Sequence, residues 1–169
     1  MSSGLRFCLV ALTLAMTCLA AHAFAKKPLD LWAFFHFNGT AFVAGKPAPL
    51  SPFVAVRDGF MPVVETNEER VMEVQLPEGS GALVGICYVQ SYGGKLKPAG
   101  GFHAVPMLEV PVTSAAGKPV TPVQTDTSGY FMIALPAGSY LVGNQRVEVK
   151  VENGKTSFIP LRVGKRMVD

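Results

Sequence analysis

Residue types that could do chemistry are few and scattered in this 169-residue chain. After the first 25 residues, only His36, His103 and Cys87 remain of its histidines and cysteines. Neither histidine has another histidine, a cysteine or a carboxylate at ligand spacing, so the sequence predicts no zinc site. Cys87 lies in the apolar run ALVGICYV, which favours a buried, inert thiol over a nucleophile. We therefore expect no enzymatic activity and no cofactor.

Other patterns that would indicate chemistry or nucleic-acid binding are also missing from the sequence. The acidic residues between Glu65 and Glu73 do not follow the spacing of a calcium loop, so we expect a solvated strand edge there. The chain has no glycine-rich phosphate loop, no G-x-S-x-G elbow and no C-x-x-C-H haem attachment motif. Without Arg6, 14 basic residues face 12 acidic ones, which is too small an excess for a nucleic-acid surface.

The first 25 residues have the pattern of a secretory signal peptide. Arg6 precedes an uncharged apolar run over 8–20, and small-residue cleavage sites end at Ala23 and Ala25. The run is too short for a comfortable transmembrane helix. The alternatives are a retained N-terminal anchor, which would be the chain's link to a membrane, and a lipid on Cys18, which the preceding Thr17 disfavours. We expect a periplasmic, extracellular or cell-surface protein without an internal disulfide.

The rest of the chain is expected to consist of strands and turns. The chain's 13 prolines and 17 glycines, all but Gly4 beyond the first 25 residues, interrupt short runs rich in valine, isoleucine, phenylalanine, tyrosine and threonine, and none of these runs keeps a helical period. This pattern predicts an all-β sandwich or barrel. The clearest expected strands cover residues 82–90, 107–115, 120–125, 147–152 and 158–163. Asn153-Gly154 predicts a hairpin turn between the last two.

The stretch TDTSGYFMIALPAGSY at 125–140 predicts a core hairpin bounded by two turns. Asp126 to Gly129 fits a type I turn, and Pro136 to Gly138 fits the next turn. Between them, Phe131, Ile133 and Leu135 fall on one face, which we expect to lie in the core because it is the bulkier face.

The motif GYFMIALPAGSYLV resembles the G-x-F-x-[IL]-x-L-P-x-G-x-Y-x-V signature of carboxypeptidase regulatory-like domains. These domains are small transthyretin-like β-sandwiches related to the Cna B-type repeats of bacterial surface proteins. The resemblance covers about residues 81–165 and implies an Ig-like or transthyretin-like antiparallel β-sandwich over 81–169. The segment 26–80 is then an N-terminal β extension that packs on this sandwich. Its TNEERVMEVQLPEGSGALVG, residues 66–85, echoes 125–143, either as a degenerate repeat of the β-unit or by chance.

Some Cna B-type relatives form an isopeptide bond between a lysine and an asparagine, assisted by a buried acid. Lys97, Asn153 and Glu109 have the residue types that this bond requires, but no motif aligns them.

The strongest candidate for a binding site is the segment 91–106, which carries Tyr92, Phe102 and His103 among glycines and prolines. Its composition predicts a long loop that is too irregular to be a strand, and such loops are often functional. Aromatic side chains there suit stacking on a sugar or gripping a peptide. The alternative is that Phe102 only closes the open end of the sandwich.

The sequence thus predicts an exported, non-enzymatic β-sandwich that serves as a structural or assembly module of the cell envelope. Its expected partner is another envelope or surface protein. The alternative is a carbohydrate- or peptide-binding module that uses 91–106.

Overall fold

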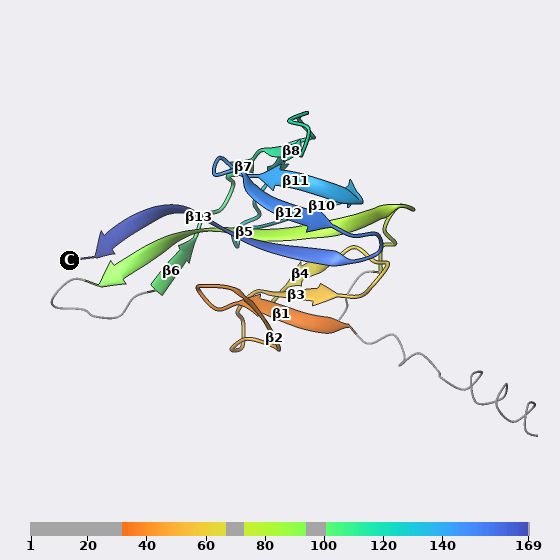
Figure 1. The fold of residues 1–169 in the computed structure, drawn as a ribbon. Helices are drawn as coiled ribbons and strands as arrows, with labels where there is room; N and C mark the ends of the chain where they lie inside the picture. Colours follow the sequence, from red (N-terminus) through yellow and green to blue (C-terminus); the bar gives the residue numbers. More distant parts are fainter. Residues whose placement is uncertain (1–31, 67–72, 94–100, 169) are drawn as a thin grey trace, which may run out of the picture. The chain divides into compact units, whose positions relative to one another are not determined.

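The fold is all-β, as the sequence predicts (Figure 1). The computed structural model describes residues 32–66, 73–93 and 101–168, and Trp32–Asp169 form one compact unit. In these ranges no helix is long and apolar enough to span a membrane. The strands are β1 (Ala33–Phe37), β2 (Phe42–Ala44), β3 (Phe53–Val56), β4 (Val63–Glu65), β5 (Ser80–Gly93), β6 (Gly101–Ala104), β7 (Glu109–Val110), β8 (Val112–Ser114), β9 (Val123–Gln124), β10 (Tyr130–Pro136), β11 (Gly138–Val142), β12 (Val147–Val151) and β13 (Thr156–Val168).

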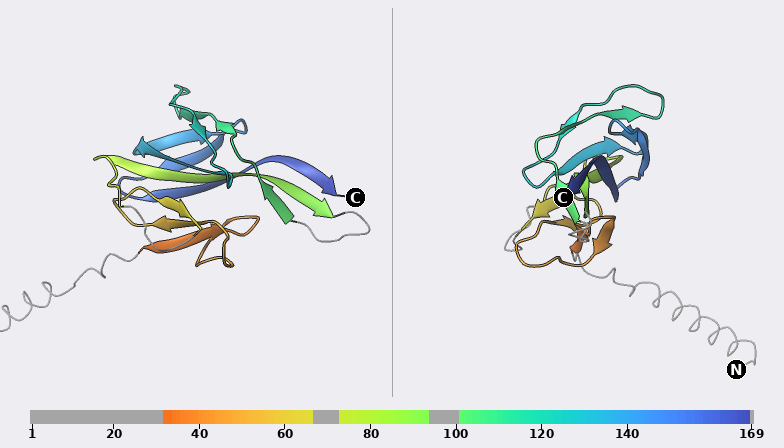
Figure 2. Two further views of the ribbon diagram at one scale, coloured as in Figure 1. Left: turned by 180° about the vertical axis from the view of Figure 1, so that it is seen from behind. Right: turned by 90° about the vertical axis from the view of Figure 1, so that its left-hand side faces the viewer.

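The strands form three stacked layers (Figure 2). The N-terminal sheet has the order β2-β1-β3-β4. The central sheet has the order β10-β5-β13, with β6 also paired to β5. The third sheet has the order β12-β11-β8, and β7 pairs with β9 beside it. The N-terminal segment therefore packs on the rest of the chain, as expected, and it supplies a layer of its own.

The three layers follow from the unbroken apolar run in β5. Successive side chains of a strand point to opposite faces, so such a run needs cover on both sides. Leu83 and Cys87 belong to the core shared with the third sheet. Val84 and Ile86 belong to a second core, shared with Phe37 and other residues of the N-terminal sheet.

Asn153-Gly154 forms the predicted turn, but the predicted hairpin is wrong. β12 pairs antiparallel with β11 in the third sheet, whereas β13 pairs parallel with β5 in the central sheet. The two strands therefore belong to different sheets, and these sheets cover opposite sides of the core in which Val151 of β12 and Ile159 of β13 are both buried. The alternation of Val147, Val149 and Val151 did not reveal this, because a hairpin would bury the same face.

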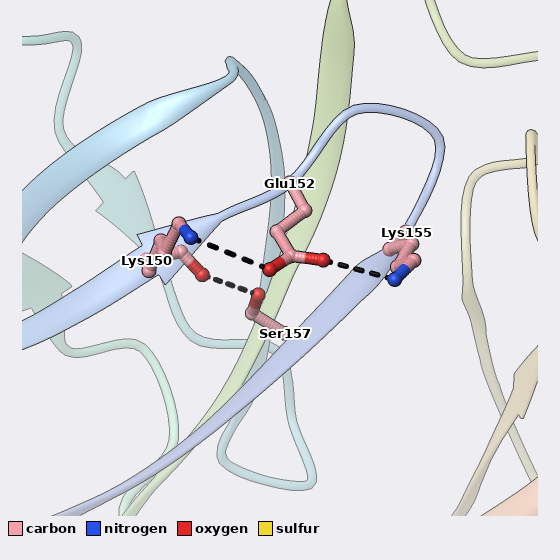
Figure 3. Close-up of polar contacts among 4 residues, drawn as sticks. All are labelled: Lys150, Glu152, Lys155 and Ser157. Carbon is pink, nitrogen blue, oxygen red and sulfur yellow. Dashed lines mark hydrogen bonds and ion pairs between the residues drawn. The ribbon is translucent and has the colours of Figure 1, made fainter.

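Polar contacts fix this turn between the sheets (Figure 3). The Glu152 carboxylate lies 2.9 Å from Lys155 Nζ and 3.6 Å from Lys150 Nζ, and Ser157 Oγ donates to the Lys150 carbonyl at 2.7 Å. Gly154, at φ +70°, donates its N–H to the Ser80 carbonyl at 2.8 Å. These contacts hold the point where the chain crosses from one layer to the next.

The 125–140 stretch is an arch and not the predicted hairpin, because β10 pairs with β5 and β11 with β12 and β8. The Tyr140 hydroxyl donates to the Pro136 carbonyl at 2.8 Å across the bend. Phe131 and Leu135 are buried as predicted, with Ile133 packed against them. Tyr130, on the opposite face, is also buried, in the second core.

Two other expected segments differ in detail from the structure. The strand expected over 107–115 is split at Pro111 into β7 and β8, and only Val123–Gln124 of 120–125 forms a strand. The two Leu-Pro-x-Gly segments of the sequence echo lie side by side, with Ala137 N–H donating to the Gly79 carbonyl at 3.0 Å. Gly79 has a positive φ of +75°, whereas Gly138 does not have a positive φ, so the two turns differ in conformation.

Packing of Phe131 against β5 gives the first testable prediction. Phe131→Ala should lower the free energy of unfolding by about 3–5 kcal/mol because it leaves a cavity in the core. Gly85→Ala should cost about 1–3 kcal/mol, because its Cβ would lie 2.1 Å from Phe131 Cζ. When Phe131 is already alanine, Gly85→Ala should lower the free energy of unfolding by less, because the ring that its Cβ would meet is gone. Urea melts of the two single variants and of the double variant measure these changes.

Gly101→Ala is the matched control, because no atom lies within 4 Å of the Cβ it would add. If Phe131→Ala melts like the parent, the arch does not belong to the core.

Candidate functional site

A groove of about 410 Å³ lies where the N-terminal and central sheets meet. Phe37 at the end of β1, the loop before β3, β5, β6 and the start of β10 contribute its walls. The lining residues are Phe37, Pro47, Ser51, Pro52, Ile86, Phe102, Ala104, Ser128 and Tyr130. Aromatic rings and prolines dominate this lining, and two serines supply hydroxyl groups. Such a lining suits an apolar or aromatic group of a ligand.

Phe102 joins the groove to the second core. Its ring meets the Phe37 ring edge-on, at 4.9 Å between centroids and 78° between planes. It also meets Tyr88 at 6.2 Å and 88°. A Cβ on Gly39 would lie 3.1 Å from this ring, so glycine leaves room for it in the β1–β2 turn. Phe102 is half-buried, and it therefore packs on the fold while still lining the groove.

The structure places the side chains of Phe102 and His103 on opposite faces of β6. His103 is exposed and pairs with Val89, and because neighbouring side chains of a strand alternate, it points away from the face of Phe102. Of these two residues, Phe102 lines the groove. Tyr92 lies near the end of β5, and its side chain lies outside the described residues.

The predicted long loop at 91–106 is wrong at both ends. β5 continues to Gly93, and β6 returns antiparallel over Gly101–Ala104, with Ser91 opposite Gly101. Backbone pairing with a long neighbouring strand overrides the weak strand preference of glycine here. Residues 94–100, which carry most of the irregular composition, lie outside the described residues.

Sequence reasoning missed the loop between β2 and β3, whose sequence at 45–52 is GKPAPLSP. Pro47 and Ser51 line both the groove and a second hollow of about 440 Å³. Leu50 also lines the second hollow. It is 86% exposed and has a φ of +66°, which is unfavourable for a branched apolar residue. We call this loop, residues 45–52, the proline ridge. Its three prolines, between two strands that each begin with a phenylalanine, are the sequence feature that could have indicated it.

Tyr130 is the one ionisable side chain among the described residues that line the groove, and burial raises the pKa of its hydroxyl. The Asp126 carboxylate nearby accepts hydrogen bonds from the N–H groups of Ser128 at 2.8 Å and Tyr130 at 2.9 Å. It therefore holds the turn into β10, where Gly129 has a φ of +79°. This turn sets the positions of Ser128 and Tyr130 in the wall of the groove.

Cys87 is a free, fully buried thiol, as the sequence predicts. It borders a small cavity of about 90 Å³ between the central and third sheets. Burial raises the pKa of the thiol to about 11, so the nucleophilic thiolate is disfavoured at neutral pH.

The remaining candidate residues lie apart. His36 Nδ1 is 2.9 Å from the Gly45 carbonyl, and the described residues contain no cluster of three potential metal ligands. Glu109 and Asn153 are both exposed, so they do not provide the buried acid and amide of an isopeptide site. Lys97 lies outside the described residues.

Comparison with known proteins identifies no family. No protein-family model matches the chain, and no curated protein matches it. Among solved structures, the chain is similar to GBS52, the minor pilin of the Gram-positive pathogen Streptococcus agalactiae, with a TM-score of 0.42 and 13% sequence identity. The similarity covers 76% of this chain and 66% of that chain, so this chain spans just under two thirds of the pilin structure.

The pKa of Cys87 gives a prediction for alkaline pH. An unperturbed thiol has a pKa of 9.0, whereas burial raises the pKa of the folded Cys87 thiol to about 11. The contribution of the buried, protonated thiol to stability is therefore complete below pH 9.0 and is lost as the pH rises through about 11. Cys87→Ala should consequently lose less unfolding free energy than the parent over this range. Urea melts across it measure the difference.

Tyr130, whose pKa is also raised, is present in both proteins and contributes the same trend to each. Equal alkaline slopes for the parent and Cys87→Ala would contradict the buried-thiol assignment.

Proposed function

We propose that this chain is an exported, non-enzymatic structural or assembly module of the cell envelope, in the periplasm or at the cell surface. The observation that carries the proposal is the proline ridge, where Leu50 is 86% exposed and lines a hollow together with Pro47, Pro49 and Phe53. Contiguous exposed apolar surface of this kind marks protein–protein interaction sites. The partner is another envelope or surface protein.

The 125–140 motif supports the finer assignment to a carboxypeptidase regulatory-like domain. Two of its polar side chains act on the fold: the Asp126 carboxylate accepts hydrogen bonds within the turn, and the Tyr140 hydroxyl donates to the Pro136 carbonyl across the arch. A motif with these roles specifies a scaffold, and the function of a scaffold lies in its surface. The domain boundaries at residues 25 and 80 belong to the same proposal.

Export is tested by fractionating cells that express the full-length chain. We expect a shortened product outside the cytoplasm, because residues 1–25 match a cleavable signal peptide. The chain without residues 1–25 is the control and should stay in the cytoplasm. A cytoplasmic product that retains residues 1–25 would contradict the proposal.

The groove favours a second candidate function, the binding of a peptide or a carbohydrate. Phe37, Phe102 and Tyr130 supply aromatic surface, and Ser51 and Ser128 supply hydroxyl groups at its edge. Aromatic rings stack on apolar side chains or on sugar faces, while hydroxyl groups orient the ligand. This candidate places the ligand on Phe102 and not on His103.

Screening the mature chain on glycan and peptide arrays tests this candidate. Phe102→Ala should weaken any binding at least about tenfold, since it removes an aromatic contact. His103→Ala, on the neighbouring position of β6, should bind like the parent because this side chain faces away from the groove. Far-UV circular dichroism checks that both variants are folded. Binding that survives Phe102→Ala would remove the groove from consideration.

A further inference from the structure

The outer edge of β13 is a structural feature that the proposed function does not use. β13 is the last strand in the order of the central sheet and pairs with β5, with a bulge in the register between Arg162 and Gly164. A long strand at the edge of a sheet presents a row of backbone N–H and C=O groups to which another chain can add. How this edge is closed therefore decides whether copies of the protein associate through it.

The hydrogen-bonding pattern shows which backbone groups face outward. The Lys155 carbonyl, one residue before β13, accepts a hydrogen bond from Ala82 N–H of β5 at 2.9 Å. Because the backbone groups of successive residues in a strand point to opposite sides, residues 157, 159 and 161 also face β5. Phe158, Pro160 and Arg162 therefore direct their backbone groups to the outer edge.

Two features interrupt this outer row of groups. Pro160 has no N–H, and prolines in sheets occur on edge strands where the missing donor faces outward. The Arg162 carbonyl is occupied, because it accepts a hydrogen bond from Gln145 Nε2. Gln145 belongs to the turn between β11 and β12, where Arg146 has a φ of +53° and donates its N–H to the Gly143 carbonyl at 3.0 Å. This turn holds the Gln145 amide over the edge of the neighbouring layer.

We infer that Pro160 and Gln145 guard the outer edge of β13 against pairing with β13 of a second copy. The second copy is the relevant occupant because an antiparallel pair of identical strands about a two-fold axis matches each outward group with the same row on its partner. Pro160 therefore offers no backbone N–H to a neighbouring strand. At Arg162, the next outward residue, the carbonyl already accepts a hydrogen bond from Gln145. Between Thr156 and Pro160, Phe158 is the residue that directs both a backbone N–H and a carbonyl to the outer edge.

The double variant Pro160→Val and Gln145→Ala tests this inference. It restores an N–H at 160, supplies a residue that favours strands, and removes the Gln145 amide from the Arg162 carbonyl. Sedimentation equilibrium of the mature chain should show self-association at least about tenfold tighter than in the parent, equivalent to about 1.4 kcal/mol. Gln145→Ala alone should shift it in the same direction. This single variant changes an exposed side chain, so it keeps the test valid if the double variant does not fold.

Gln90→Ala is the matched control. Its amide also donates to a backbone carbonyl, that of Gly101 at 3.1 Å, but within the β5–β6 pair and away from the outer edge. It should associate like the parent. If the folded double variant, or Gln145→Ala when the double variant is unfolded, sediments like the parent, then Gln145 and Pro160 shape their local turn and strand without guarding the edge, and the inference is overturned.

Discussion

Burial of β5 on both faces is the constraint on which the rest of the structure depends. Its alternate side chains enter two separate cores, so a sheet must cover each face. The close approach also needs glycine: a Cβ on Gly85 would collide with the Phe131 ring, and one on Gly81 would lie 2.1 Å from the Glu152 carbonyl oxygen. The central strand therefore combines large apolar residues with glycines where neighbouring elements come closest.

The groove is a consequence of this layering. The N-terminal sheet covers one face of the central sheet, and Phe37, Phe102 and Tyr130 meet where the cover ends. Phe37 and Tyr130 belong to the second core and Phe102 packs against it, so the groove and the core share side chains at this place. The proline ridge then borders the groove from outside, and its prolines restrict the loop that carries Leu50.

The parallel pairing of β13 with β5 shapes the surface in another way. The chain crosses from β12 in the third sheet to β13 in the central sheet through the turn at Glu152–Lys155. β13 is then an edge strand of the central sheet. An edge strand leaves one row of its backbone N–H and C=O groups facing away from the sheet, where another chain can pair with them. The hydrogen bond from the Gln145 amide to the Arg162 carbonyl joins the turn between β11 and β12 to the outer edge of β13.

The sequence by itself determined the all-β class, the strand at the centre, the turn at Asp126–Gly129 and the burial of Phe131 and Cys87. These features depend on the conformational preferences of single residues and on the alternation of apolar and polar residues along a strand. Both can be recognised in a short stretch of sequence. Only the tertiary structure decided which strands lie side by side. Alternation shows which face of a strand is buried, but a hairpin and an arch between two sheets bury the same face. The groove depended on tertiary structure for the same reason, because Phe37, Phe102 and Tyr130 are far apart in the chain and meet only when the layers stack.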